Sequence, residues 1–135
     1  MKIMIVDDEQ GTRKLIKTVC LDAGFNNIFE ASNGLEAKKL IINPPPARKG
    51  ESVFTRKFNL IISDWMMPIM NGIELLQYVR KKSKIRNVPF ILLTSQNDRS
   101  DFETAIKEGV TDYIVKPFTS EELQIKLSKI ISMSD

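Results

Sequence analysis

The chain has 135 residues, of which 42% are hydrophobic and 27% charged; these values predict one globular domain over 1–135 and exclude a disordered chain. It contains no histidine and a single cysteine, Cys20, which excludes a Ser-His-Asp triad, a histidine zinc site, an internal disulfide and a thiolate metal cluster. The net charge of +3 equals the excess of four basic residues over one acidic residue within 43–58, and without a basic groove carrying interleaved aromatics we expect no nucleic-acid partner.

The amino-terminal segment and the lengths of the apolar runs bear on location. No run approaches the roughly 18 apolar residues that cross a bilayer, so we expect no membrane insertion. The first apolar run meets Asp7 and Asp8 too early for a signal peptide. We therefore expect a cytoplasmic protein that acts as a monomer.

Short apolar runs alternate with longer stretches of helical periodicity along the chain. In chain order the predicted elements are a strand at 2–6, a helix at 12–23, a strand at 27–31, a helix at 34–42, a strand at 58–63, a helix at 71–82, a strand at 88–94, a helix at 99–108, a strand at 112–115 and a last helix opened by Thr119. Glu122 lies three residues after Thr119, which is the spacing of a capping box. Gly24 and Gly109 are placed to end two of the helices.

Several helices present an apolar side to the expected core. The apolar positions are Leu15, Ile16, Val19 and Cys20 in the first helix, Ile73, Leu75, Leu76 and Val79 in the third, and Leu123, Ile125, Leu127, Ile130 and Ile131 in the last. Strands that alternate with such helices form a parallel sheet. Right-handed crossovers then favour an α/β fold, with a doubly wound sheet of five parallel strands and helices on both faces.

One segment interrupts this alternation. Three prolines at 44–46 end the second helix, because they cannot continue it. The stretch of about 43–58 is long for a loop in a small domain. We expect a surface insertion that lies at the amino-terminal edge of the sheet, and a partner-docking loop is the alternative.

Chemically competent side chains follow four of the predicted strands. Ligands of open α/β sheets bind outside the carboxyl ends of the strands. The side chains at those ends are Asp7, Asp8 and Glu9 after the first strand, Asp64 after the third, Thr94 and Ser95 after the fourth, and Lys116 after the fifth. Each residue alone has an ordinary explanation as a helix cap, a turn residue or a surface residue, but together they predict one site at one edge.

Three carboxylates at neighbouring strand ends would repel one another by about 4 kcal/mol per pair at roughly 4 Å and an effective dielectric constant near 20. A divalent cation with oxygen ligands, Mg²⁺ or Mn²⁺, would balance them. Such a cation beside a lysine and a hydroxyl suits phosphoryl transfer, in which a carboxylate acts as the nucleophile. The chemistry by itself leaves open which aspartate accepts the phosphoryl group.

Four short motifs carry a resemblance to a known family. They are Val6-Asp7-Asp8, Ser63-Asp64-Trp65-Met66-Met67-Pro68, Leu93-Thr94-Ser95 and Val115-Lys116-Pro117-Phe118. In this order and spacing, the chain resembles the receiver domains of response regulators, and most of all the single-domain chemotaxis regulators of the CheY type. The resemblance covers nearly the whole chain outside 43–58, and it implies a flavodoxin-like fold with strand order 2-1-3-4-5.

The resemblance also implies a role for each site residue. Asp64 would accept the phosphoryl group, and the cation would be held by Asp7, Asp8 and Asp64 with the backbone carbonyl of Met66. Lys116 and Thr94 would contact the phosphoryl oxygens, and Tyr113 would move inward with Thr94 as part of the switch. The Lys116–Pro117 peptide bond would be cis.

The implied partners are a sensor histidine kinase or a histidine phosphotransfer protein as donor, and a downstream target protein. The target would read the surface formed by the helix at 99–108, the strand at 112–115 and the last helix. Such a protein is phosphorylated and signals, but it is not an enzyme acting on a separate substrate. Three alternatives remain open at this point: an inactive receiver-like scaffold that only binds protein, a metal-dependent phosphatase with an aspartyl nucleophile, and a flavin or nucleotide module.

Overall fold

The parallel sheet has the strand order β2-β1-β3-β4-β5 in a computed structural model that describes residues 1–50, 57–95 and 99–133. The elements are β1 (Lys2–Val6), α1 (Gln10–Asp22), β2 (Asn27–Ala31), α2 (Gly34–Ile42), β3 (Leu60–Asp64), α3 (Gly72–Lys82), β4 (Phe90–Thr94), α4 (Arg99–Lys107), β5 (Asp112–Val115) and α5 (Ser120–Met133). The predicted α/β class, the flavodoxin-like strand order and the helices on both faces are confirmed. None of the helices in the described part of the chain has the length and apolar character of a membrane span.

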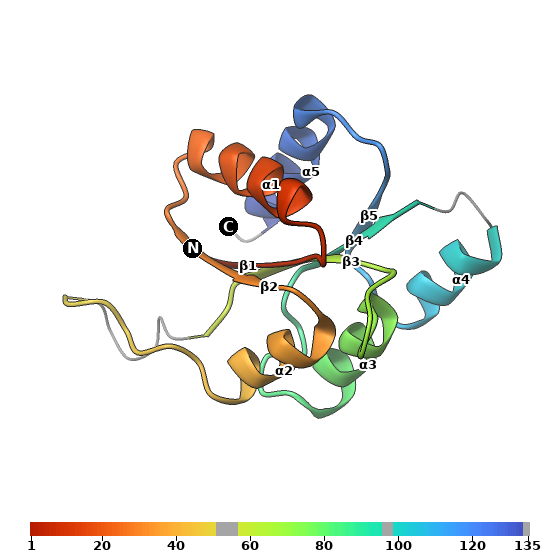
Figure 1. Cartoon of the computed structure of the whole chain (residues 1–135), viewed down its shortest axis with the longest axis horizontal. Coiled ribbons are helices and arrows are strands. Elements are labelled where there is room, and N and C mark those ends of the chain that lie inside the picture. Colours follow the sequence, from red (N-terminus) through yellow and green to blue (C-terminus); the bar gives the residue numbers. More distant parts are fainter. Residues whose placement is uncertain (51–56, 96–98, 134–135) are drawn as a thin grey trace.

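Alternate residues of the central strands face two separate cores. Helices α1 and α5 cover one face of the sheet, and α2, α3 and α4 cover the other (Figure 1). On β1, Ile3 and Ile5 join the core beneath α1 and α5, whereas Met4 joins the core beneath α2 and α3. Strands β1, β3 and β4 are buried along their whole length, as expected for parallel strands covered on both sides.

Two predicted strands begin later than expected. The strand predicted from residue 58 begins at Leu60. Phe58 precedes it and packs edge-to-face on Phe29, with 5.7 Å between the ring centroids. The strand predicted from residue 88 begins at Phe90. Pro89 has no N–H to donate to the ladder, although its carbonyl accepts a hydrogen bond from Ile61.

Two expected core residues lie at the surface. Leu15 is 38% exposed and Ile125 is 58% exposed, while their neighbours Ile16 and Leu123 are buried. One residue along a helix turns the side chain by about 100°, and two residues by about 200°, so only part of each apolar set faces the sheet. The first helix also begins two residues earlier than predicted, at Gln10, and ends before Gly24, whose φ of 94° is the left-handed conformation that glycine favours.

The predicted insertion at about 43–58 is described only in part, because residues 51–56 lie outside the described residues. Residues 44–50 leave the end of α2, and the Arg48 guanidinium donates a hydrogen bond to the Asn26 carbonyl at 2.9 Å. The chain returns through Lys57 to the amino end of β3.

Candidate functional site

The strand pairing brings together four of the predicted site residues. Val6 of β1 pairs with Ser63 of β3, so Asp7 and Asp64 follow neighbouring strands at the same edge. Thr94 ends β4, and its carbonyl accepts a hydrogen bond from the Lys116 N–H at 2.7 Å. A single edge of the sheet therefore collects two carboxylates, a hydroxyl and an ammonium group.

Lys116 joins the two buried carboxylates. Its Nζ lies 3.0 Å from Oδ2 of Asp7 and 3.3 Å from Oδ2 of Asp64. The other oxygen of each carboxylate accepts a backbone hydrogen bond at 2.9 Å, from Glu9 to Asp7 and from Trp65 to Asp64. Both carboxylates are thereby held with one oxygen toward the lysine.

Burial and neighbouring charge set the protonation of this group. Burial raises the pKa of Asp64 to about 6, the charge of Asp7 adds to the rise, and Lys116 opposes it. Burial alone would lower the pKa of Lys116, but its hydrogen bond to Asp7 and the charges of Asp64 and Asp7 raise that pKa instead. Two close carboxylates with one lysine retain excess negative charge, which favours a further cation.

Asp7, Asp8 and Asp64 could hold that cation. One oxygen from each carboxylate lies within 4.8 Å of the others, Asp7 and Asp64 are buried, and Asp8 is exposed to solvent. Carboxylate oxygens without nitrogen or sulfur ligands fit a hard divalent ion such as Mg²⁺. The Met66 side chain is 63% exposed to solvent. The part of Met66 expected to bind the cation is its backbone carbonyl, not this side chain.

Backbone hydrogen bonds hold the two ends of the loop at residues 65–71, which follows Asp64. The Gly72 N–H donates to the Trp65 carbonyl at 2.8 Å, and the Gly34 N–H donates to the Met70 carbonyl at 2.9 Å. A Cβ on Gly72 would overlap the Asp64 carbonyl oxygen, and one on Gly34 would lie 2.6 Å from the Met70 carbonyl oxygen. Both positions therefore require glycine, because the backbones approach too closely for a side chain.

Sequence reasoning missed this positioning role of Gly34 and Gly72. A signal was present, because each glycine follows an asparagine and precedes a glutamate by two residues. Asn33 and Asn71 cap α2 and α3 by accepting a hydrogen bond from the backbone N–H of Glu36 and Glu74. The repeated Asn-Gly-x-Glu pattern thus marks the two helix starts that hold the loop after Asp64.

The residues expected to form the switch lie at the junction of three elements. Thr94 is buried at the end of β4. Tyr113 of β5 is half-buried, with its ring centroid 4.5 Å from that of Phe102 on α4 and 5.7 Å from Nζ of Lys126 on α5. The Lys116–Pro117 peptide bond after β5 is cis.

Comparison with known proteins gives consistent matches. The family model described as "Response regulator receiver domain" matches residues 3–128. The chemotaxis protein CheY1 of Helicobacter pylori is 35% identical over 100% of both chains, and CheY-3 of Vibrio cholerae is 39% identical over 96% of this chain and 91% of the relative. The solved structure of CheY4 of Vibrio cholerae has a TM-score of 0.79 and 30% identity, covering 96% of this chain and 97% of that one.

Proposed function

The chain belongs to the response regulator receiver domain family, and we propose that its Asp64 takes a phosphoryl group from a phosphohistidine of a partner protein, with Mg²⁺ bound. The observation that carries this proposal is the position of Lys116, which lies within 3.3 Å of carboxylate oxygens of both Asp7 and Asp64. The donor would be a sensor histidine kinase or a histidine phosphotransfer protein.

Each site residue has a chemical role in this proposal. A carboxylate oxygen of Asp64 attacks the phosphorus atom as the bond to the donor imidazole nitrogen breaks, so one P–O bond replaces one P–N bond. When bound by Asp7 and Asp8, the cation would neutralise charge on the phosphoryl oxygens. Lys116 would contact a phosphoryl oxygen, and the Thr94 hydroxyl would donate to another.

The signal to a target protein would arise from the negative charge added at Asp64. A phosphoryl group carries about −1.5 to −2 charges near pH 7, which draws Thr94 and Lys116 toward it. Movement of Thr94 would open space for Tyr113, which contacts Phe102 of α4 and Lys126 of α5. Tyr113 thus lies where it can change the α4-β5-α5 surface, and a target protein would read that change.

Mass spectrometry of the intact chain after incubation with acetyl phosphate and Mg²⁺ tests the proposal. We expect the mass of one phosphoryl group on the native chain and on Asp22→Ala, a change of an exposed carboxylate at the end of α1. We expect none on Asp64→Ala. Equal labelling of Asp64→Ala would assign the phosphoryl group elsewhere, and an unlabelled native chain would favour a protein-binding scaffold. Turnover of a chromogenic phosphate ester would instead indicate a phosphatase.

A further inference from the structure

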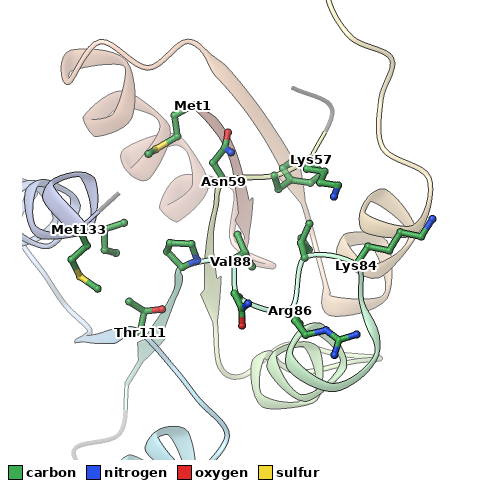
Figure 2. A pocket seen from close by; sticks show the side chains of 13 residues that line it. Met1, Lys57, Asn59, Lys84, Arg86, Val88, Thr111 and Met133 are labelled. Atoms are coloured by element: carbon green, nitrogen blue, oxygen red, sulfur yellow. The ribbon is translucent and has the colours of Figure 1, made fainter. Parts of the chain in front are cut away.

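A groove of about 850 Å³ opens at the end of the sheet opposite the carboxylate site (Figure 2). We call it the basal groove. It lies where β1, β3, β4 and β5 begin and where α5 ends, and it is bounded by Met1, Lys57, Lys84, Arg86, Thr111 and Met133. None of the residues that act in the proposed phosphotransfer borders it, so its chemistry requires a separate explanation.

The rim of the basal groove is cationic on one side. Lys57, Lys84 and Arg86 are exposed, and none of the described residues that line the groove is acidic. The opposite end of the same sheet carries Asp7 and Asp64 among its acids. The rim of the basal groove therefore carries positive charge, which attracts a ligand with negative charge.

The other side of the basal groove carries apolar side chains. Figure 2 shows Met1 and Met133 across the groove from Lys57, Lys84 and Arg86. Met133 is 72% exposed, and methionine adapts its shape to different apolar partners. A ligand that fills the groove should thus carry both carboxylates and aliphatic groups, which an inorganic anion does not.

Hydrogen bonds of the Arg80 side chain hold one wall of the groove in place. The Arg80 guanidinium donates to the carbonyls of Arg86 at 2.9 Å, Val88 at 2.6 Å and Gly109 at 2.8 Å. Thr111, which also lines the groove, is held to the start of β4, because its hydroxyl accepts a hydrogen bond from the Phe90 N–H at 2.9 Å. These bonds fix the loop between α3 and β4, so little ordering of that loop would oppose binding.

A smaller hollow of about 190 Å³ adjoins the groove, with Met1 and Asn59 bordering both. It is also lined by Asn27, whose buried Oδ1 has no hydrogen-bond partner within the described part of the chain. An unpaired buried acceptor favours a ligand with N–H donors. A peptide backbone supplies such donors, whereas a carboxylate or phosphate supplies acceptors.

We propose that the basal groove binds an acidic segment of a partner protein, in which aspartate or glutamate stands next to aliphatic side chains. The carboxylates would lie against Lys57, Lys84 and Arg86, and the aliphatic groups would lie against Met1 and Met133. Binding does not require phosphorylation of Asp64, because the groove is at the other end of the strands. The protein would thus have a docking surface separate from the α4-β5-α5 surface.

The test uses a fluorescent synthetic peptide in which glutamate alternates with leucine, with anisotropy measured on the full chain. We expect the double variant Lys84→Glu, Arg86→Glu to weaken binding by about tenfold or more, because two attractions become repulsions. The double variant Lys14→Glu, Lys107→Glu makes the same change in net charge at exposed positions on α1 and α4 and should bind the peptide almost as the native chain does.

Further arms separate the possible ligands. Weaker binding by Met133→Ser, and by a peptide with serine in place of leucine, would support contact with the apolar side. No binding by the native chain, or equal weakening in both double variants, would overturn the proposal. So would full displacement of the peptide by inorganic phosphate, or a dimer that forms through this face. Acetyl phosphate labelling of the Lys84→Glu, Arg86→Glu chain is measured independently of peptide binding. Labelling at the native level would show that this variant is folded and that the chemistry at Asp64 is intact.

Discussion

Gly72 lies directly against Asp64, so that a Cβ on Gly72 would overlap the Asp64 carbonyl oxygen and approach a Leu92 methyl group to 2.9 Å. The start of α3 therefore determines the position of the backbone that carries the expected phosphoacceptor. Since this contact is between backbones, it depends on the absence of a side chain at residue 72 and not on any property of Asp64 itself.

Gly72→Ala should lower the free energy of unfolding by about 1–3 kcal/mol, because the added methyl group has no space and the backbone of β3 must shift. It should also slow phosphoryl labelling of Asp64. Gly11→Ala is the matched control, since a Cβ at Gly11 meets nothing within 4 Å and alanine favours the helix by about 0.5–1 kcal/mol. Urea unfolding should show changes of opposite sign, and equal stability of the two variants would contradict the close approach.

Lys116→Met should slow labelling by acetyl phosphate by about a hundredfold, because the phosphoryl oxygens would lose the ammonium group proposed to contact them. Mg²⁺ binding, followed by the fluorescence of Trp65 beside Asp64, should persist or strengthen, since one positive charge is removed from the carboxylates. Lys81→Met is the control, because it removes an exposed ammonium group that pairs with Glu108 at 3.4 Å and takes no part in the carboxylate site. A labelling rate unchanged in Lys116→Met would be incompatible with the assigned role.

Asp64→Asn should stabilise the metal-free chain at neutral pH. The folded pKa is about 6 and the ordinary value 3.8, so the folded chain binds a proton more tightly than the unfolded chain, and stability is lost as the pH rises through this window. The variant avoids this loss, which corresponds to on the order of 2 kcal/mol above pH 6. Urea unfolding in EDTA at a series of pH values should show a gain near pH 7.5 that disappears near pH 4. A gain of the same size at both ends would rule out titration of Asp64 as its cause.

Ile69→Asn should raise the free energy of unfolding by about 1 kcal/mol, because asparagine tolerates the left-handed conformation better than a β-branched residue. Ile69 has a φ of 71° and is 73% exposed, so little apolar packing is lost. Met66→Asn in the same loop has no positive φ to relieve and should leave stability nearly unchanged. Thermal unfolding of the two variants checks the difference, and destabilisation by Ile69→Asn would show that the isoleucine makes a contact of its own.

The order of strands and helices was readable from the sequence, because hydrophobic periodicity is a local property. The apolar run at residues 2–6 predicted a buried strand, and the acids after it and after the strand predicted at 58–63 predicted a site at the carboxyl ends. Periodicity failed at Leu15, which lies one helical turn before the buried Val19 in α1 but is 38% exposed. The burial of a helical side chain depends on what lies opposite it, and a pattern along one helix does not contain that information.

The sequence by itself determined the fold class and the residue types available for chemistry, since both follow from apolar spacing and from the absence of histidine. Only the tertiary structure decided how those groups interact. Lys116 meets Asp7 across 109 positions of sequence, the raised pKa of Asp64 comes from burial by several elements, and the basal groove is formed by strand beginnings and a helix end far apart in the chain. Distances and dielectric surroundings of this kind arise only when separate segments pack together.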